Sequence, residues 1–275
     1  MFLVIDIGGT KTLLALFSRH GHLKKRQKFE TSPSKEAFLA TLEINLKSFL
    51  AEIPREKILE TVVAIPGVVS FEQNSYSFKF GNLNWEDIDL FTPIKNLVND
   101  HISFINDASL ATFYEASRLN SSKKIIYLTF STGIGGGLFK NNTLLSSSAS
   151  FEPGHKSYSF EGKTLEWEDI ASAKALSEAY SSRLDSLALT TPETTSDLVS
   201  RLSLGLIDIV KSEKPDVLII GGPLAFLFKK LKKPLLSSLK SALPEEKLPS
   251  LHSAHRPTES VIYGGLLLAK TKTGV

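Results

Sequence analysis

The chain begins with a hydrophobic run that a short polar turn interrupts. Residues Phe2 to Ile7 are almost all apolar, Gly8-Gly9-Thr10-Lys11 follows, and a second apolar run extends from Thr12 to Phe17. Runs of this length that are rich in β-branched residues and bounded by glycine are typical of β-strands. The pattern therefore predicts a strand, a glycine-rich turn and a second strand.

The same design returns near the middle of the chain. An apolar run from Lys124 to Phe130 is followed by Ser131-Thr132-Gly133 and then by a second apolar run from Ile134 to Phe139. A strand, a small polar turn and a strand are thus predicted again. The recurrence indicates that one architecture starts twice.

Helical and extended patterns alternate through the rest of the chain, which predicts mixed sheets covered by helices. We expect helices over Lys35–Leu50, Ala108–Leu119, Leu165–Arg183, Thr195–Lys211 and Thr258–Lys272, and strands over Thr61–Ile65, Ile102–Ile105 and Val217–Ile220.

Composition narrows the class of protein. With 275 residues, 42% of them hydrophobic and 22% charged, the chain has room for two compact α/β lobes. Its first apolar run is too short for a signal peptide or a membrane span, so we expect a cytoplasmic protein without a membrane partner. Cysteine is absent, which excludes disulfides and Cys-based zinc sites. The net charge of +3 is spread along the chain, so nucleic acid is not favoured as a partner.

The two glycine turns carry chemistry suited to phosphate. Backbone amides of glycine can approach phosphate oxygens closely, and a threonine hydroxyl adds a donor. Gly8-Gly9-Thr10 and Thr132-Gly133 both offer these groups. Either turn alone could be a plain hairpin. Together they suggest two loops that face one nucleotide across a cleft.

Phosphoryl transfer also needs a carboxylate to accept the proton of the attacking hydroxyl. Asp107, next to Asn106 at the end of a predicted strand, is the candidate. Its alternative role is the N-cap of the following helix. Asp6 could bind Mg²⁺ through water, or it could cap the first turn.

Several motifs, in this order and spacing, resemble those of the ROK family of sugar kinases and repressors. They are Asp6-Ile7-Gly8-Gly9-Thr10-Lys11, Asn106-Asp107-Ala108, Ser131-Thr132-Gly133-Ile134-Gly135-Gly136-Gly137, Glu152-Pro153-Gly154-His155, Leu218-Ile219-Ile220-Gly221-Gly222 and Tyr263-Gly264-Gly265. The resemblance covers nearly the whole chain.

The resemblance implies two ribonuclease-H-like lobes of the actin-like ATPase kind. We expect them over residues 1–107, joined by the C-terminal helix 258–275, and over residues 108–257. It further implies an ATP- and Mg²⁺-dependent kinase that phosphorylates a hexose, by default glucose at O6. Fructose, mannose or an N-acylhexosamine is the alternative substrate, and a catalytically silent sugar-binding protein is the alternative function. Only the resemblance suggests a homodimer.

The same resemblance assigns roles to individual residues. Asp107 becomes the general base, and Asn106, Glu152 and His155 bind the sugar. Phosphate contacts are assigned to Gly8, Gly9, Thr10, Lys11, Thr132 and Gly133, and contacts to adenosine are assigned to Gly221 and Gly222. Gly67 and Asn82 are further sugar candidates for which turn formation is an equal alternative.

The chain also departs from the family pattern. ROK proteins commonly carry a Cys-rich knuckle after the Gly-His pair, and that histidine is one of its zinc ligands; here no cysteine exists, so we expect no zinc. Ser131 replaces a usual glycine, which is tolerable if its φ is negative. The repressor branch has a helix-turn-helix before its first glycine motif, and Asp6 lies so close to Met1 that we expect no such repressor.

ROK proteins place a sugar-binding glutamate shortly before an Ala-Ser pair at the start of a helix, and Glu166 and Glu168 are both candidates for it. On a single helix their side chains would point about 200° apart, so that only one could face the sugar. Spacing from Ala171-Ser172 selects Glu168. The aromatic residues Phe151, Tyr158, Phe160 and Trp167 are expected to stabilise this region by packing.

Overall fold

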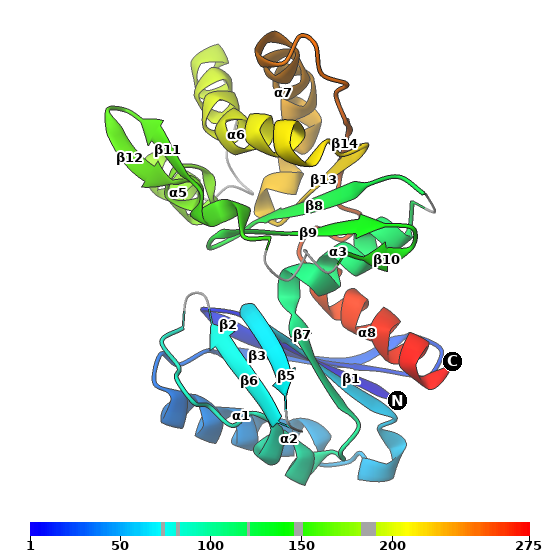
Figure 1. Cartoon of the computed structure of the whole chain (residues 1–275). Helices are drawn as coiled ribbons and strands as arrows, with labels where there is room; N and C mark the ends of the chain where they lie inside the picture. Colours follow the sequence, from blue (N-terminus) through cyan, green and yellow to red (C-terminus); the bar gives the residue numbers. More distant parts are fainter. Residues whose placement is uncertain (73–74, 81–82, 120–121, 146–150, 183–190) are drawn as a thin grey trace. The chain divides into compact units, whose positions relative to one another are not determined.

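The computed structural model describes residues 1–275 except 73–74, 81–82, 120–121, 146–150 and 183–190. The chain divides into two compact units (Figure 1). Unit 1 comprises Met1–Ala111 and Val261–Val275, and unit 2 comprises Thr112–Ser260. No helix among the described residues is both long and apolar enough to cross a membrane.

Unit 1 is built on a five-stranded sheet with the order β3-β2-β1-β4-β7. Its first three strands pair antiparallel, and β1, β4 and β7 pair parallel. The strands are β1 (Phe2–Ile7), β2 (Lys11–Phe17), β3 (Leu23–Glu30), β4 (Glu60–Ile65) and β7 (Ile102–Asn106). A separate hairpin of β5 (Gly67–Glu72) and β6 (Ser75–Phe80) follows β4.

Both faces of this sheet are buried, because alternate side chains of its central strands enter two hydrophobic clusters. Leu3, Ile5 and Ile7 of β1 join the cluster that contains residues of α1 (Lys35–Leu50) and α2 (Phe91–Leu97). Phe2 and Val4 join the cluster that contains residues of α8 (Ser260–Thr273). The predicted boundaries of the first strand and of helix α1 are confirmed.

Unit 2 repeats the same strand order, β10-β9-β8-β13-β14. Again the first three strands pair antiparallel and the last three pair parallel. The strands are β8 (Ile125–Phe130), β9 (Ile134–Lys140), β10 (Thr143–Leu144), β13 (Val217–Gly221) and β14 (Ser250–Ser253). The prediction that one architecture starts twice is confirmed.

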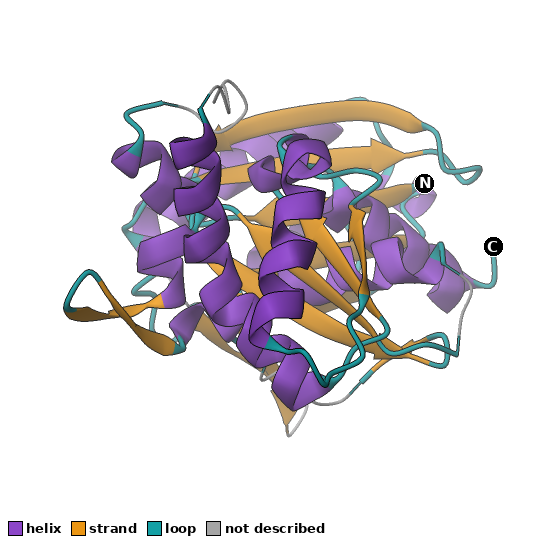
Figure 2. Ribbon diagram, turned by 90° about the horizontal axis from the view of Figure 1, so that it is seen from above, coloured by secondary structure: helices purple, strands orange, loops and turns teal. Residues whose placement is uncertain are grey.

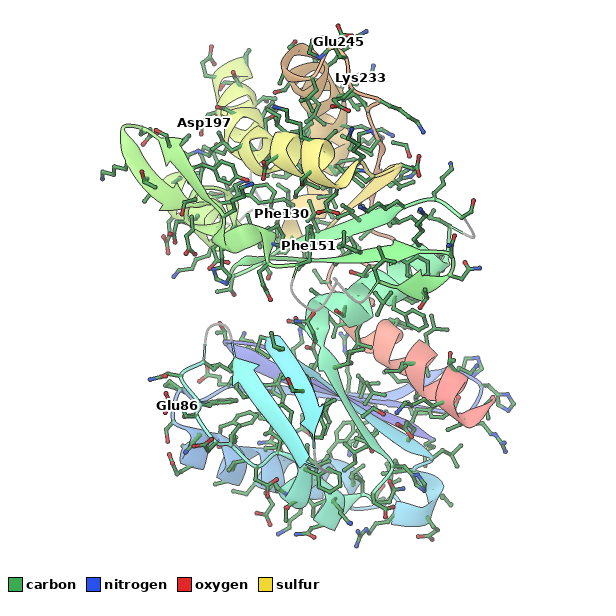
Figure 3. All side chains as sticks on the ribbon, viewed as in Figure 1. Glu86, Phe130, Phe151, Asp197, Lys233 and Glu245 are labelled. Carbon is green, nitrogen blue, oxygen red and sulfur yellow. The ribbon has the colours of Figure 1, made fainter. Side chains whose placement is uncertain are left out.

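One face of the second sheet packs against two long helices, α6 (Pro192–Glu213) and α7 (Phe228–Ala242) (Figure 1). Figure 2 distinguishes such helices from the strands that they cover. Phe130, labelled in Figure 3, is fully buried in this cluster and meets the Trp167 ring edge-on at 5.4 Å. The backbone of α6 comes so close to Trp167 that a Cβ at Gly205 would lie 2.3 Å from the indole. The four aromatic residues expected to pack here all belong to this cluster.

The single helix predicted over Leu165–Arg183 is wrong. Its first residues instead form the second strand of a hairpin, β11 (Ser157–Phe160) and β12 (Lys163–Glu166). Two short helices follow, α4 (Trp167–Ala171) and α5 (Ala173–Ala179), because Ser172 has an extended conformation with a ψ of 160° and its hydroxyl caps α5. The helical spacing of apolar residues did not reveal this break.

Helices α3 (Asp107–Ser117) and α8 contain the two points where the chain passes from one unit to the other. A Cβ at Gly264 of α8 would lie 2.1 Å from the backbone oxygen of Leu110 in α3. Further along α3, the buried carboxylate of Glu115 accepts hydrogen bonds from the backbone N–H groups of His255 and Arg256 and from the Ser260 hydroxyl, at 2.8, 2.9 and 2.6 Å. Both connections are therefore held together by close contacts.

We predict that Gly264→Ala lowers the free energy of unfolding. Alanine normally favours a helix interior by about 1 kcal/mol over glycine. Here the new methyl group would overlap a backbone oxygen, and overpacking of this kind costs about 1–3 kcal/mol. Urea denaturation measures the change, and Thr271→Ala at an exposed position of the same helix is the control. A Gly264→Ala variant that is more stable than the parent would contradict the close contact between α3 and α8.

Candidate active site

The predicted site residues of unit 1 gather at one edge of its sheet. Asp6 lies near the end of β1, Gly67 follows β4, and Asn106 ends β7. These three strands are parallel, so their carboxyl ends meet at the same edge. These positions therefore come to one edge although they are far apart in sequence.

The first glycine turn is fixed by its own backbone and by β3. The Gly8 N–H donates to the Lys11 carbonyl at 3.0 Å, and a Cβ at Gly8 would lie 2.9 Å from that oxygen. The Thr31 N–H donates to the Thr10 carbonyl at 2.9 Å. Gly9, Thr10 and Lys11 remain exposed. The turn thus presents small residues and a cation to solvent on a rigid support.

Asn106 connects the loop after β4 to the start of α3 at this edge of the sheet. Its Nδ2 donates to the Gly67 carbonyl at 2.8 Å, and its Oδ1 accepts from the Ser109 N–H at 2.8 Å. Gly67 has a φ of 122°, which strongly favours glycine. The amide of Asn106 keeps one N–H and one lone-pair direction for a ligand.

The bond from Ser109 makes Asn106 the cap of α3. Asp107 is then the first helical residue, and its Oδ1 accepts from the Ala108 N–H at 2.7 Å. The alternative that Asp107 serves as the N-cap is wrong, because the preceding residue fills that position. Asp107 is half-buried at the start of α3, directly after the end of β7.

Asp6 carries a carboxylate in a poorly hydrated position. Burial raises its pKa to about 6, and the positive charge of Lys28 opposes the shift. Among the described residues, no hydrogen bond reaches this carboxylate. An ionised carboxylate that is buried without a hydrogen-bond partner lowers the stability of the fold. A cation beside Asp6, or a water molecule bound to a cation, would offset this loss.

The second glycine turn, in unit 2, joins β8 to β9. The Ser131 N–H donates to the Gly133 carbonyl at 2.9 Å, and the Lys174 N–H at the start of α5 donates to the Ser131 carbonyl at 3.2 Å. Ser131 is not among the residues with positive φ, so the condition for serine at this position is met. Thr132 lies at the exposed tip of the turn.

Glu168 packs between two glycines. Its Oε2 accepts from the Ile134 N–H at 3.2 Å. A Cβ at Gly133 would lie 2.4 Å from the same oxygen, and a Cβ at Gly154 would lie 2.9 Å from it. At Gly154 a Cβ would also lie 2.4 Å from the Ile134 carbonyl oxygen, so this position requires glycine, whereas a side chain at position 133 would have to displace the Glu168 carboxylate. Glu168 thus links the Glu152–His155 loop to the second glycine turn.

Glu166 also reaches this place, which corrects the expectation that Glu166 and Glu168 point away from each other. Glu166 ends β12 and precedes α4 with extended dihedral angles, so the helical geometry does not apply to it. Its Oε2 lies 2.8 Å from Nδ1 of His155. Ligand atoms of His155, Glu166 and Glu168 all lie within 4.8 Å of one another.

Charge and burial shift two pKa values here. The hydrogen bond with Glu166 raises the pKa of His155, and the negative charges of Glu168, Glu166 and Glu152 act in the same direction against partial burial. Partial loss of hydration raises the pKa of Glu152; His155 opposes this shift and Glu168 adds to it. The loop is therefore a cluster of three carboxylates around one imidazole.

Packing explains why glycine occupies the two predicted adenosine-side positions, Gly221 and Gly222. A Cβ at Gly221 would lie 2.2 Å from the hydroxyl of buried Tyr127. Gly222 has a φ of 68°, and a Cβ there would lie 2.3 Å from the Phe130 carbonyl oxygen. Their contact with adenosine stays a prediction. Asn82 lies outside the described residues.

Comparison with known proteins gives kinases and a repressor. A fructokinase from Lactococcus lactis subsp. cremoris is 27% identical over 166 residues, which cover 60% of this chain and 56% of that protein. An N-acetylmannosamine kinase from Vibrio vulnificus is 32% identical over 155 residues, 54% of this chain and 50% of that protein. A xylose repressor from Bacillus spizizenii is 24% identical over 277 residues, 92% of this chain and 68% of that protein. The chain thus spans about half the length of the two kinases.

Solved structures share the fold over almost the whole chain. A ROK family glucokinase from Streptomyces griseus, in complex with glucose and AMPPNP, superposes with a TM-score of 0.78 at 19% identity, covering 98% of this chain and 99% of that one. A ROK hexokinase from Thermus thermophilus gives a TM-score of 0.71 at 22% identity, covering 99% of each chain. These likenesses confirm the predicted fold class. The family model for ROK matches residues 2–272, and the chain belongs to the ROK family.

Proposed function

We propose that the protein is an ATP-dependent sugar kinase that transfers the γ-phosphoryl group to a hexose, with glucose at O6 as the first candidate. The observation that carries this proposal is the place of Asp107. Its carboxylate lies at the sheet edge, half-buried, while Asn106 provides the helix cap. A half-buried carboxylate at the first residue of this helix, directly after the strand end, suits a general base.

Each part of the site has a role in this reaction. Asn106, Gly67, Glu152, His155 and Glu168 bind sugar hydroxyls, and Asn82 completes this set. The turns Gly8–Lys11 and Thr132–Gly133 bind the phosphates, with Gly221 and Gly222 on the adenosine side.

The chemical step needs one proton transfer by the protein. The sugar hydroxyl gives its proton to the Asp107 carboxylate as its oxygen bonds to the γ-phosphorus, and the bond from that phosphorus to the bridging β-phosphate oxygen breaks to release ADP. Mg²⁺, when bound, neutralises charge that develops on the phosphates. Asp6 would hold it, directly or through water, which fits the raised pKa of this carboxyl.

The relatives widen the choice of substrate and function. Fructokinase and N-acetylmannosamine kinase are among them, so fructose, mannose and N-acylhexosamines are the alternative acceptors. The xylose repressor supports a second candidate, a sugar-binding protein without turnover. Release of ADP from ATP, measured with each of these sugars in turn, distinguishes the two. Sugar-dependent ADP release supports the kinase, and binding of a sugar without ADP release supports the silent protein.

We predict that Asp107→Asn lowers kcat by about 10²- to 10⁴-fold, the usual cost of losing a positioned base. The affinity for sugar, measured by titration calorimetry, changes little because asparagine keeps the size and polarity of the side chain. Asp100→Asn, at an exposed position before β7, is the matched control and keeps the parent rate. Parent-like turnover of Asp107→Asn would refute the role of this carboxylate.

We also predict that Asp6→Asn stabilises the fold at neutral pH while it lowers kinase activity. The pKa of Asp6 is raised to about 6, above its ordinary value of 3.8, so its ionised form costs folding free energy above pH 6. The variant should therefore gain about 1–3 kcal/mol at pH 8, and the gain should shrink as the pH falls through 6 towards 4. Urea denaturation at several pH values measures this. A variant less stable than the parent at pH 8 would show that the charge has a partner in the fold.

A further inference from the structure

The segment between His155 and α4 is a tight hairpin. Glu161 and Gly162 connect its strands with φ values of 50° and 76°. Positive φ at both positions indicates a type I′ turn, which matches the twist of paired strands and holds their register. In that register Ser157 lies opposite Glu166, so Glu166 comes beside the residues that precede β11.

The hairpin is fastened to α6 by its side chains. The Tyr158 hydroxyl donates to the Asp208 carboxylate at 3.2 Å, and the guanidinium of Arg201 lies over the Phe160 ring at 4.6 Å. At the end of β12, the Trp167 indole N–H donates to the Arg201 carbonyl at 3.1 Å. Backbone pairing continues past the strands, since the Trp167 N–H donates to the Lys156 carbonyl at 2.9 Å. Glu166 is therefore held on both sides by ordered neighbours.

The side chains near His155 that could ligate a metal do not form the structural zinc site that the family pattern implies. A structural zinc site is closed by four ligands, usually with several thiolates. The sequence has no cysteine, and within the described part of the chain only His155, Glu166 and Glu168 are placed to approach one cation together. His155 and Glu166 are hydrogen-bonded to each other, and Glu168 accepts a hydrogen bond from the Ile134 backbone N–H.

We propose that the Glu166 carboxylate positions His155 in place of a metal, keeping the proton on Nδ1 and leaving Nε2 for a sugar hydroxyl. The contact of 2.8 Å carries this inference. An ionised carboxylate only accepts hydrogen bonds, so Nδ1 must donate and the tautomer is fixed. Glu166 is thus a positioning residue, comparable to the carboxylates that orient histidines behind metal centres. The role of Nε2 rests on the proposed function, whereas the His155–Glu166 pair does not.

The other charged groups near the imidazole fit this division of tasks. Glu152 and Glu168 both act on His155 electrostatically, but within the described part of the chain neither is hydrogen-bonded to its ring. The Glu168 carboxylate accepts a hydrogen bond from the Ile134 N–H, and Glu152 precedes the short turn Pro153–His155. Glu166 alone among the three is hydrogen-bonded to the imidazole.

The test compares Glu166→Gln with the parent. An amide can donate as well as accept, so the variant no longer fixes the tautomer, although its size is unchanged. Nitrogen-15 NMR of the protein without sugar, with the His155 signals assigned by their loss in His155→Asn, should show a protonated Nδ1 in the parent and a mixture of tautomers in the variant. In the kinase assay, the sugar KM of the variant should rise about tenfold while kcat changes less than about twofold.

Glu161→Gln in the turn of the same hairpin is the matched control and should keep the parent tautomer and KM, because Glu161 pairs only weakly, at 3.6 Å, with Arg201. Equal melting temperatures of the parent and Glu166→Gln confirm that the hairpin remains folded. In the neutral imidazole of the parent, a proton on Nε2 and none on Nδ1 would overturn the proposal, as would stoichiometric zinc by elemental analysis or a variant with the parent tautomer and KM. If no sugar is phosphorylated, the proposed function fails, and the tautomer measurement still decides the pairing.

Discussion

The parallel pairing of β1, β4 and β7 is the constraint on which the site in unit 1 depends. Each parallel crossover returns the chain to the same end of the sheet, so three separate loops begin at one edge. Within β1, the alternation that buries Phe2 and Val4 brings Asp6 to the same face of the sheet. The strand that supplies the core therefore also holds the carboxylate in a poorly hydrated position.

Unit 2 has the same strand order, but different contacts hold its glycine turn and the hairpin that follows. Its glycine turn is held by Glu168, whose carboxylate accepts from the Ile134 N–H and packs against Gly133 and Gly154. The hairpin that follows is fastened by aromatic and charged side chains on α6. A short segment without cysteine thus becomes ordered through packing, and its acidic residues are placed around His155.

Sequence reasoning predicted the fold class and the repeated architecture because buried strands and glycine turns leave strong local patterns. It missed the hairpin at 157–166, since the apolar spacing there also suits a helix; the Glu161-Gly162 pair between aromatic and apolar residues was the available signal. It left the N-cap of α3 open as an alternative role of Asp107, and it could not identify Asn106 as the cap, because only the hydrogen bond from the Ser109 N–H distinguishes the two residues. The pairing of His155 with Glu166 depends on hairpin register, which local spacing does not determine.

Phosphoryl transfer to a sugar at the edge of the unit 1 sheet is the central proposal. Transfer of the labelled terminal phosphate from γ-labelled ATP into the sugar tests it most directly, because release of ADP alone could come from hydrolysis. We expect the label in a sugar phosphate with the parent chain, and we expect this product to be lost with Asp107→Asn. Label found only in inorganic phosphate with every hexose would contradict it.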